Sequence, residues 1–417
     1  MKTYKVLTTV FLAGVLLSLS ACEDYVQNVD DPINVIEAEA IADEAQIPFF
    51  MDGVVGRYHI THDALTVIAG GLSDALEFDS GNVRDATFPT FRDIDIGEIT
   101  LDNNSVDGPF NNLGRARYLA DDLLRVVNEI SFEDSDLQTE ATYTANLYGG
   151  LARYAYAAYF GLTEEQGGAT IDNGPFIPSA DMYDQAREKF QAAITSAPTD
   201  YDERVANSLL GRTYLYEGDY ASAIPFLEAG MEPGDAPFQS QHSLESQNAF
   251  DSQAGASRNQ LTVSSRYNDY IEDDADEANR ILLEVLPEDE VTDAGVDAGV
   301  VIYRQTKYGP DTNINIMSWQ ENHLMLAEAE IEEGGLTGGI TARNLVNEVR
   351  DSHDIDPLGI GETVDRNLLL EERDKELYLT GNRMIDQRRF DFFHLPEGTW
   401  RYFPLTQSER NENPNID

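Results

Sequence analysis

A repeated pattern of small and aromatic residues in the middle of the chain constrains the fold most. Between residues 207 and 230 (NSLLGRTYLYEGDYASAIPFLEAG), small residues recur where two helices would touch, and larger residues fill the space beyond them. Gly218-Asp219 interrupts the pattern and supplies a turn. A helix of the same type runs through residues 183–193, and residues 145–160 are its expected partner. The sequence therefore predicts two stacked helical pairs.

The spacing within residues 207–230 matches the packing positions of a tetratricopeptide (TPR) repeat. Two units are too few for a free-standing solenoid, because each repeat buries its apolar face only against a neighbour. Other helices must cap them, and helical periodicity predicts such helices at residues 37–57, 66–75, 112–130, 318–333, 341–351 and 367–379. The predicted fold class is mostly α.

Two segments lack this periodicity. Residues 79–110 are rich in Gly, Asp, Asn and Phe and are predicted to form a long surface loop. Residues 231–313 are predicted to form an irregular, partly β inserted subdomain, with strands near 299–303 and 304–308. We also predict an irregular tail over about the last 25 residues. Ligand-binding residues are expected in these irregular segments, because loops on a rigid scaffold commonly carry function.

The N-terminus reads as a lipoprotein signal peptide over residues 1–21. Lys2 and Lys5 precede an apolar stretch that is too short to span a bilayer, and it ends in Leu19-Ser20-Ala21-Cys22. That ending looks like a lipobox, in which the Cys22 thiol receives a lipid. Acylation explains why the chain has a single cysteine; the alternative is an ordinary signal peptide with a chance cysteine. Residues 22–35 are acidic and polar and are predicted to be a lipidated tether.

The charge of the chain excludes one class of partner. With 28 Lys and Arg against 76 Asp and Glu, the formal net charge is −48. Such a field repels phosphate backbones, so we expect no nucleic-acid partner. Because 41% of the residues are hydrophobic, a core is available and the charge belongs on the surface. A habitat of high salt explains the acidity better than a specific cationic ligand.

Four C-terminal motifs, taken together, resemble those of the SusD/RagB-like outer-membrane nutrient-binding lipoproteins. They are residues 321–329 (ENHLMLAEA), 347–350 (NEVR), 371–389 (EERDKELYLTGNRMIDQRR) and 403–415 (FPLTQSERNENPN). The lipobox, the TPR-like units and the irregular insertion follow in the order of that family. One departure is Ser318, which stands where the family usually has an arginine.

The resemblance implies a protein that captures nutrients. Members of the family are not enzymes; they bind oligosaccharides, sometimes peptides, and pass them to a SusC-like TonB-dependent transporter. It also implies an outer-membrane location with a lipid anchor, facing the cell surface, and Glu23-Asp24 resemble a surface-export signal. The expected regions are the signal 1–21, the tether 22–35, a helical and TPR region 36–230, the insertion 231–313 and a C-terminal helical region with its tail, 314–417.

The charged residues of the C-terminal signature are expected to be structural. In a chain with few cations, clustered arginines indicate ion pairs that hold the terminal helices to the TPR units. The alternative is that they contact ligand. The signature residues are Glu321, Glu328, Arg350, Glu372, Arg373, Glu376, Gly381, Arg383 and Asp386, with Arg388 and Arg389 beside them.

The candidate ligand-binding residues combine aromatic faces with polar neighbours, as sugar sites do. One group lies in the first irregular segment and one in the insertion: Phe88, Phe91, Arg92 and Phe110, and Tyr267, Asn268 and Tyr270. The alternative is that each aromatic anchors its loop to the core.

Catalytic and metal-binding motifs give little support to other functions. The sequence has no G-x-S-x-G elbow, P-loop or H-E-x-x-H motif, and 76 acidic residues make chance carboxylate pairs uninformative. His59, His62 and Asp63 could share a metal, but a polar helix edge explains them better. The acidic run 273–277 lacks the ligand order of a calcium loop. No cofactor or metal is expected.

Three other functions remain open beside glycan capture. A peptide-binding lipoprotein would show a groove with free strand edges instead of exposed coplanar aromatic rings. A TPR scaffold for envelope proteins would show a concave groove without small pockets. A lipid-anchored hydrolase would need a carboxylate pair at catalytic separation in a cleft.

Overall fold

The computed structural model describes residues 43–292 and 301–416. The predicted signal peptide, Cys22 and the tether lie outside the described residues, as does part of the strand expected near 299–303. The chain divides into two compact units, Met1–Gln46 and Ile47–Asp417. Of the first unit only residues 43–46 are described, with a short 3-10 helix, η2 (Glu44–Gln46).

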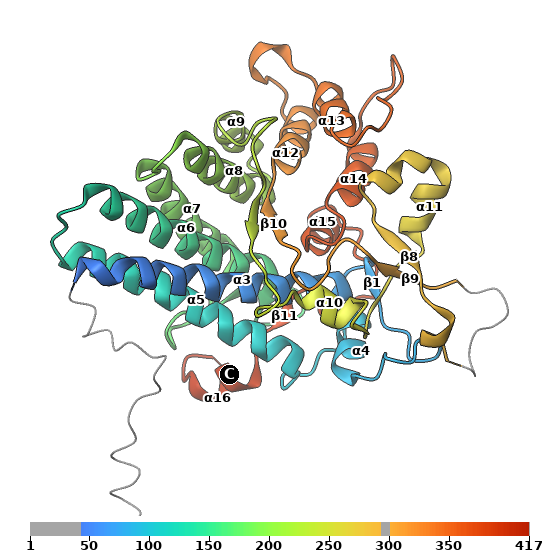
Figure 1. The fold of residues 1–417 in the computed structure, drawn as a ribbon, viewed down its shortest axis with the longest axis horizontal. Coiled ribbons are helices and arrows are strands. Elements are labelled where there is room, and N and C mark those ends of the chain that lie inside the picture. The colour runs from blue at the N-terminus through green and yellow to red at the C-terminus, as the bar shows by residue number, and fades with distance from the viewer. Residues whose placement is uncertain (1–42, 293–300, 417) are drawn as a thin grey trace, which may run out of the picture. The chain divides into compact units, whose positions relative to one another are not determined.

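Helices dominate the second unit, which confirms the predicted mostly α fold (Figure 1). Its described α-helices are α3 (Ile47–Leu72), α4 (Pro89–Asp95), α5 (Asn104–Glu129), α6 (Ser135–Tyr159), α7 (Ser179–Thr195), α8 (Asp200–Tyr216), α9 (Tyr220–Glu228), α10 (Ala249–Ala254), α11 (Arg266–Asp273), α12 (Trp319–Glu332), α13 (Ala342–Asp351), α14 (Arg366–Glu376), α15 (Asn382–Arg389) and α16 (Gln407–Glu412). The 3-10 helices are η3 (Ala275–Asn279), η4 (Glu288–Glu290) and η5 (Thr337–Gly339).

The strands are short and form small sheets. The antiparallel four-stranded sheet has the order β1 (Leu76–Glu77), β7 (Thr262–Val263), β9 (Tyr303–Gln305) and β8 (Leu283–Val285). The antiparallel pairs are β5 (Phe238–Ser240) with β10 (Ile314–Met317), and β3 (Gly168–Ala169) with β4 (Ile177–Pro178). The parallel pair is β2 (Phe160–Gly161) with β11 (Phe403–Pro404).

The long helices pack in chain order, each against the next. Helix α3 packs on α5, and the contacts continue through α6, α7 and α8 to α9 (Figure 1). Helix α12 then covers α9 and also contacts α13 and α14. This arrangement confirms both predicted helical pairs, α6 with α7 and α8 with α9. It also shows how the C-terminal helices cap the stack, as a two-repeat solenoid requires.

The TPR-like signature explains the close packing of α8 and α9. A Cβ on Gly211 would lie 2.5 Å from Cδ2 of Leu227, so only glycine lets the two helices approach this closely. The turn between them places Gly218 at φ +78°, a conformation that L side chains rarely adopt. Asp219 then caps α9, because its side chain accepts a hydrogen bond from the Ser222 N–H. The sequence predicted both the close approach and the turn.

Helix α6 forms the centre of the stack. Its residues from Thr144 to Tyr159 are buried on every side of the helix, whereas most surface helices bury one stripe. Alanine and glycine there leave room for neighbouring helices: a Cβ on Gly150 would lie 2.6 Å from the Phe190 ring. The tyrosines of α6 fill the remaining space, as with Tyr154, whose ring lies near those of Tyr183 and Tyr216.

Several predicted boundaries are wrong. Helix α3 is continuous, whereas we expected two helices. The polar run 58–65 (YHITHDAL) interrupts the apolar pattern of the sequence, although most of its residues are buried in the structure. The expected loop 79–110 contains α4 and the start of α5, whose first turn is capped by Asn103. The insertion contains helices α10 and α11 as well as strands, and of the two strands expected near 299–308 only β9 is described. The tail contains β11 and α16.

The last part of the chain returns to the first helices. Beyond the β2–β11 pair, the Ser408 hydroxyl hydrogen-bonds Asp107 on α5 at 2.5 Å. The Asn413 side chain donates to the Gly174 carbonyl at 2.9 Å, and the Arg388 guanidinium donates to the Ala158 carbonyl at the end of α6. Segments more than two hundred residues apart in sequence are therefore held side by side.

The charged signature residues form buried ion pairs, the kind of contact that a structural role for this cluster requires. Arg373 is fully buried and holds Asp386 through two hydrogen bonds of 2.9 and 3.0 Å. The other pairs reach outward to earlier helices: Arg383 with Asp74, Arg389 with Glu328, and Glu321 with Arg212. Gly381, at φ +83°, is the residue that precedes α15. These contacts tie α14 to α15, α15 to α12 and to the turn after α3, and α12 to α8.

A larger network lies between η3, α13 and α14. Glu372 accepts from Arg280 at 2.7 Å and from Arg350 at 2.6 Å, and both arginines also contact Glu277. Lys375 is a third cation in this network, 3.2 Å from Glu277. Burial alone would raise the pKa of Glu277, but the hydrogen bonds and charges of Arg280 and Lys375 outweigh burial and hold that pKa below its usual range. The acidic run 273–277 therefore ends in a buried structural carboxylate.

Candidate functional site

The first candidate group splits into three residues on or beside α4 and one residue on α5. Phe88 directly precedes α4, and Phe91 and Arg92 lie on it. Phe110 is on α5 and buried, with ring centroids 5.8 Å from Tyr156 and 5.1 Å from Phe160. The expectation that Phe110 faces a ligand is corrected: it packs the interface between α5 and α6.

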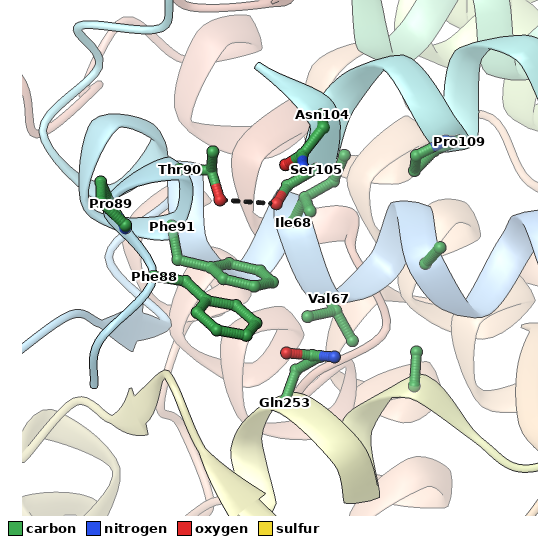
Figure 2. A pocket seen from close by; sticks show the side chains of 12 residues that line it. Val67, Ile68, Phe88, Pro89, Thr90, Phe91, Asn104, Ser105, Pro109 and Gln253 are labelled. Carbon is green, nitrogen blue, oxygen red and sulfur yellow. Dashed lines mark hydrogen bonds between the residues drawn. The ribbon is translucent and has the colours of Figure 1, made fainter. Parts of the chain in front are cut away.

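Phe88 and Phe91 border a pocket of about 420 Å³ (Figure 2). Their rings are nearly parallel, with centroids 6.5 Å apart and an interplanar angle of 13°. Phe91 is 5% exposed, whereas Phe88 is 39% exposed and offers part of its ring to solvent. Arg92 does not line the pocket; its side chain points to solvent beside Asp93, 3.3 Å away.

The segment that carries Phe88 is held by a buried glutamine from the insertion. The Gln260 Oε1 accepts hydrogen bonds from the Thr87 and Phe88 N–H groups at 3.1 and 2.9 Å. Gln260 is 1% exposed, and its own amide donates to the Asp85 carbonyl. The guanidinium of Arg258 lies over the outer Phe88 ring, 4.9 Å from its centroid. Gln260 therefore holds the backbone of Phe88, and Arg258 packs over its ring.

Polar groups stand beside the aromatic pair. Thr90 and Ser105 hydrogen-bond each other at 2.9 Å across the gap between α4 and α5 (Figure 2). The Asn103 side chain donates to the Thr90 carbonyl at 2.9 Å and fixes the same gap. On the other side, the Gln253 amide of α10 points toward the Phe88 ring (Figure 2). The pocket thus combines one partly exposed aromatic ring with hydroxyl and amide groups.

Helix α3 supplies the apolar back wall, and a buried carboxylate behind it positions α10. Val67 and Ile68 line the pocket. Asp63 accepts a hydrogen bond from the Ala249 N–H at 2.9 Å, which fixes the first residue of α10. Burial raises the pKa of Asp63 to about 7, although its hydrogen bonds from the Ala249 and Ala64 N–H groups act in the other direction.

The two histidines of α3 are buried and neutral. The Gln241 N–H donates to Nδ1 of His59, so the proton of the ring lies on Nε2, which contacts the Tyr148 hydroxyl at 3.2 Å. His62 contacts the Ser240 hydroxyl at 3.0 Å. Burial lowers the pKa of His59 to about 4 and that of His62 to about 3. Both rings join α3 to the β5 region, and among the described residues no three His, Cys, Asp or Glu side chains form a metal site.

The second candidate group lies on α11, and it packs against α14. Tyr267 is 1% exposed, its ring contacts Tyr378 at 4.6 Å, and its hydroxyl donates to Asp374 at 2.8 Å. Tyr270 is partly exposed and also donates to Asp374, at 3.1 Å. Asn268 bonds Glu272 on the same helix. The structure corrects the expectation for Tyr267, because a buried ring has no face to offer a ligand.

Sequence reasoning missed several residues that line or support the pocket. Val67, Ile68, Gln253 and Ser105 lie on helices, and Gln260 acts from behind the site. Only α10 had a local signal: Asn248 caps it, with a side chain that accepts from the Phe250 N–H. Nothing in the sequence pattern shows that α10 and α4 face each other.

No helix within residues 43–292 and 301–416 combines the length and the apolar content needed to cross a bilayer.

Comparison with known proteins supports the resemblance seen in the motifs. The family model described as SusD family matches residues 193–417. No curated protein matches the chain. Among solved structures, a SusD superfamily protein from Bacteroides vulgatus ATCC 8482 is similar, with 15% identity and a TM-score of 0.71, over 90% of this chain and 98% of that chain.

Two other similar structures carry functional descriptions. A laminarin binding SusD-like protein is 15% identical, with a TM-score of 0.69, over 89% of this chain and 98% of that chain. The surface glycan-binding protein A from Bacteroides thetaiotaomicron is 12% identical, with a TM-score of 0.67, over 90% and 98%. At these identities the likeness establishes the fold.

Proposed function

This chain belongs to the SusD family, and from that premise we propose that it binds an extracellular saccharide in the pocket beside Phe88. The carrying observation is the Phe88 ring, which is 39% exposed and held in place next to the hydroxyl groups of Thr90 and Ser105 and the amide of Gln253. Aromatic faces pack on the C–H faces of pyranose rings, and hydroxyls and amides bind sugar hydroxyl groups. The glycan-binding descriptions of two similar structures support the same ligand class.

The pocket favours binding over cleavage. Glycoside hydrolysis generally needs two carboxyl groups on either side of the scissile bond. Within the described part of the chain, the pocket lining contains neither Asp nor Glu. The nearby carboxylate of Asp63 is occupied by backbone N–H groups. We therefore propose a capture protein and not an enzyme.

The proposal includes an anchor and a partner. The lipobox at Cys22 would attach the chain to the outer membrane through a lipid, with residues 22–35 as the tether. The captured saccharide would pass to a SusC-like TonB-dependent transporter, the partner that the family implies. We retain the division into a helical region 36–230, an insertion 231–313 and a C-terminal region 314–417 as part of this proposal. If the anchor is correct, a Cys22→Ser variant should no longer be found in the membrane fraction.

Calorimetry on residues 23–417, which contain the whole compact unit Ile47–Asp417, tests the binding site. We expect binding to one class of polysaccharide from a panel of glycans and peptides. Phe88→Ala should weaken that binding about tenfold, because it removes the exposed ring. The matched control is Phe49→Ala, since Phe49 is 70% exposed and lies at the other end of α3.

Three outcomes decide the proposal. Loss of affinity in Phe88→Ala but not in Phe49→Ala supports the site. Equal affinity in both variants would retain glycan capture and reject this pocket. Retention of peptides with no glycan bound would replace the saccharide by a peptide ligand.

A further inference from the structure

A second pocket, on α3 and α5, gathers positive charge in an otherwise acidic protein. It has a volume of about 430 Å³, and Arg57, Arg115 and Arg117 line it together with Tyr118. The whole chain has only 28 lysines and arginines against 76 acidic residues. The Tyr118 ring is 53% exposed, which is unusual for an aromatic side chain on a helix of the stack.

Arg117 forms the rigid side of this pocket. It is 7% exposed, and its two terminal nitrogens bind the Asp172 carboxylate, one of them at 3.0 Å. A further contact of 3.3 Å reaches Asp121. Its Nε is buried without a hydrogen-bond partner. The pocket therefore already holds one carboxylate, that of Asp172, and has a donor to spare.

The other two arginines are not neutralised. Arg57 donates to the side-chain oxygen of Asn112 at 3.3 Å, and Arg115 is exposed. In the part of the chain that the structure describes, neither of the two forms an ion pair with a carboxylate. This contrasts with Arg125 on the same helix, which contacts both Asp122 and Glu129. Two guanidinium groups thus keep most of their donors for a ligand.

The charges around the pocket do not cancel. Asp121 is shared by Arg117, Arg153 and Lys189, and Asp172 is bound by Arg117. Among the residues that line the pocket, Arg57, Arg115 and Arg117 stand against one carboxylate, that of Asp172, an excess of two positive charges. This excess has the sign opposite to the net charge of −48.

We propose that this pocket is a subsite for an acidic sugar, one that carries a carboxylate or a sulfate group. The inference rests on the proposed saccharide function and narrows its ligand class. Guanidinium groups bind planar and tetrahedral oxyanions through paired hydrogen bonds. The exposed Tyr118 ring beside Arg115 gives the sugar an apolar face to pack on. The Arg117–Asp172 pair already shows how a carboxylate is bound here.

The position of the pocket fits a chain of sugars. Both pockets are built on α3 and α5: Asn104 lines the aromatic pocket and Tyr118 lines the arginine pocket. Fourteen positions of helix separate these two residues, about 21 Å along the axis and about 40° around it, so they share one side of α5. An oligosaccharide can cover that distance, whereas a single sugar cannot.

The acidic surface would orient such a ligand. At about 0.1 M salt the Debye length is about 10 Å, so a polyanion close to this pocket senses the local excess of positive charge more than the distant carboxylates. Elsewhere the surface repels it. Repulsion around an attractive patch selects one docking position, as in other charge-complementary interfaces.

Calorimetry on residues 23–417 tests the inference with an oligogalacturonate as the acidic probe and a neutral β-glucan oligosaccharide as the comparison. The double variant Arg57→Gln, Arg115→Gln should bind the acidic probe at least about tenfold more weakly. Asp172→Asn should bind it several-fold more tightly, since it frees Arg117 and removes a competing carboxylate. Asparagine suits this position, where φ is +50°. Arg125→Gln is the matched control and should bind like the wild type.

The results separate this inference from the proposed function. If the neutral oligosaccharide binds and the acidic one does not, the acidic subsite is rejected and saccharide capture stands. If neither binds, the proposed function itself fails. Unchanged affinity for the acidic probe in the double variant also rejects the subsite. A poly-glutamate peptide that competes as well as the acidic sugar would assign the pocket to an acidic protein partner and overturn the proposal.

Discussion

Two sets of arginines differ in their partners: those of the buried charge network around α13 and α14, and those beside the two pockets. Arg280, Arg350 and Arg373 are at most 7% exposed, and each contacts one or more buried carboxylates. Arg57, Arg115 and Arg258 form no ion pair within the described residues, and each lies beside an open pocket or an exposed ring. Between these two sets, pairing with a buried carboxylate separates stabilising charge from charge that is available for binding.

The largest expected effect comes from removing a carboxylate of the buried ion-pair network. Glu372→Gln removes the charge that Arg280 and Arg350 share, and leaves two buried guanidinium groups without full compensation. We expect a loss of about 3–5 kcal/mol in the free energy of unfolding, measured by denaturant titration. Glu371→Gln is the control, because Glu371 is 45% exposed and should cost less than about 1 kcal/mol. Equal losses in the two variants would contradict the buried network.

The next effect concerns a buried carboxylate without an arginine partner. Folded Asp63 keeps its proton up to a pKa of about 7, whereas the unfolded chain releases it near 3.8. The folded wild type therefore loses stability as pH rises between these values. Asp63→Asn lacks this penalty, so the difference in unfolding free energy should move in favour of the variant by about 2 kcal/mol from pH 5 to pH 8. Thermal melts across that range measure it, and a difference independent of pH would reject the raised pKa.

A smaller effect is expected from substituting an arginine that has no ion pair within the described residues. Arg258 lies over Phe88 without an ion pair, so Arg258→Gln should loosen the ring and weaken saccharide binding by two- to fivefold, about 0.5–1 kcal/mol. The melting temperature should stay unchanged, since no buried charge loses its partner. A large drop in melting temperature would place Arg258 with the structural arginines instead.

The smallest effect is expected at Arg125. Its partners Asp122 and Glu129 lie on the same exposed helix face. Arg125→Gln should change neither the melting temperature nor saccharide binding measurably, because exposed pairs on a helix contribute little. A clear drop in melting temperature would show that exposed and buried carboxylate partners stabilise this protein alike.

Local signals in the sequence predicted the helical stack well. Gly211 and Gly218 mark a close approach and a turn, and both depend on residues within one repeat. The charge pattern also predicted that Arg373 and Arg383 pair with carboxylates, although their partners, Asp386 and Asp74, came only from the structure. The middle of helix α3, between the two predicted helices, was missed because its polar residues bond to distant segments, as His62 does to Ser240.

The candidate site was predictable only in part. Phe88 and Phe91 were correctly placed beside each other, but Phe110 and Tyr267 are buried, and composition cannot tell an exposed aromatic ring from a buried one. The rest of the pocket depends on contacts across long sequence separations. Gln260 and Phe88 are 172 residues apart. No local pattern encodes such a pair.

The return of the C-terminal segment to α5 and α6 also bears on how the chain folds during synthesis. The β2–β11 pair and the Arg388 and Ser408 contacts cannot form until almost the whole polypeptide has been made. Such non-local contacts raise the contact order and slow folding. Premature termination before residue 403 would leave the end of α6 uncovered, with Phe160 without the Phe403 ring that packs on it. Fragments of this kind should aggregate and be degraded instead of surviving as functional half-proteins.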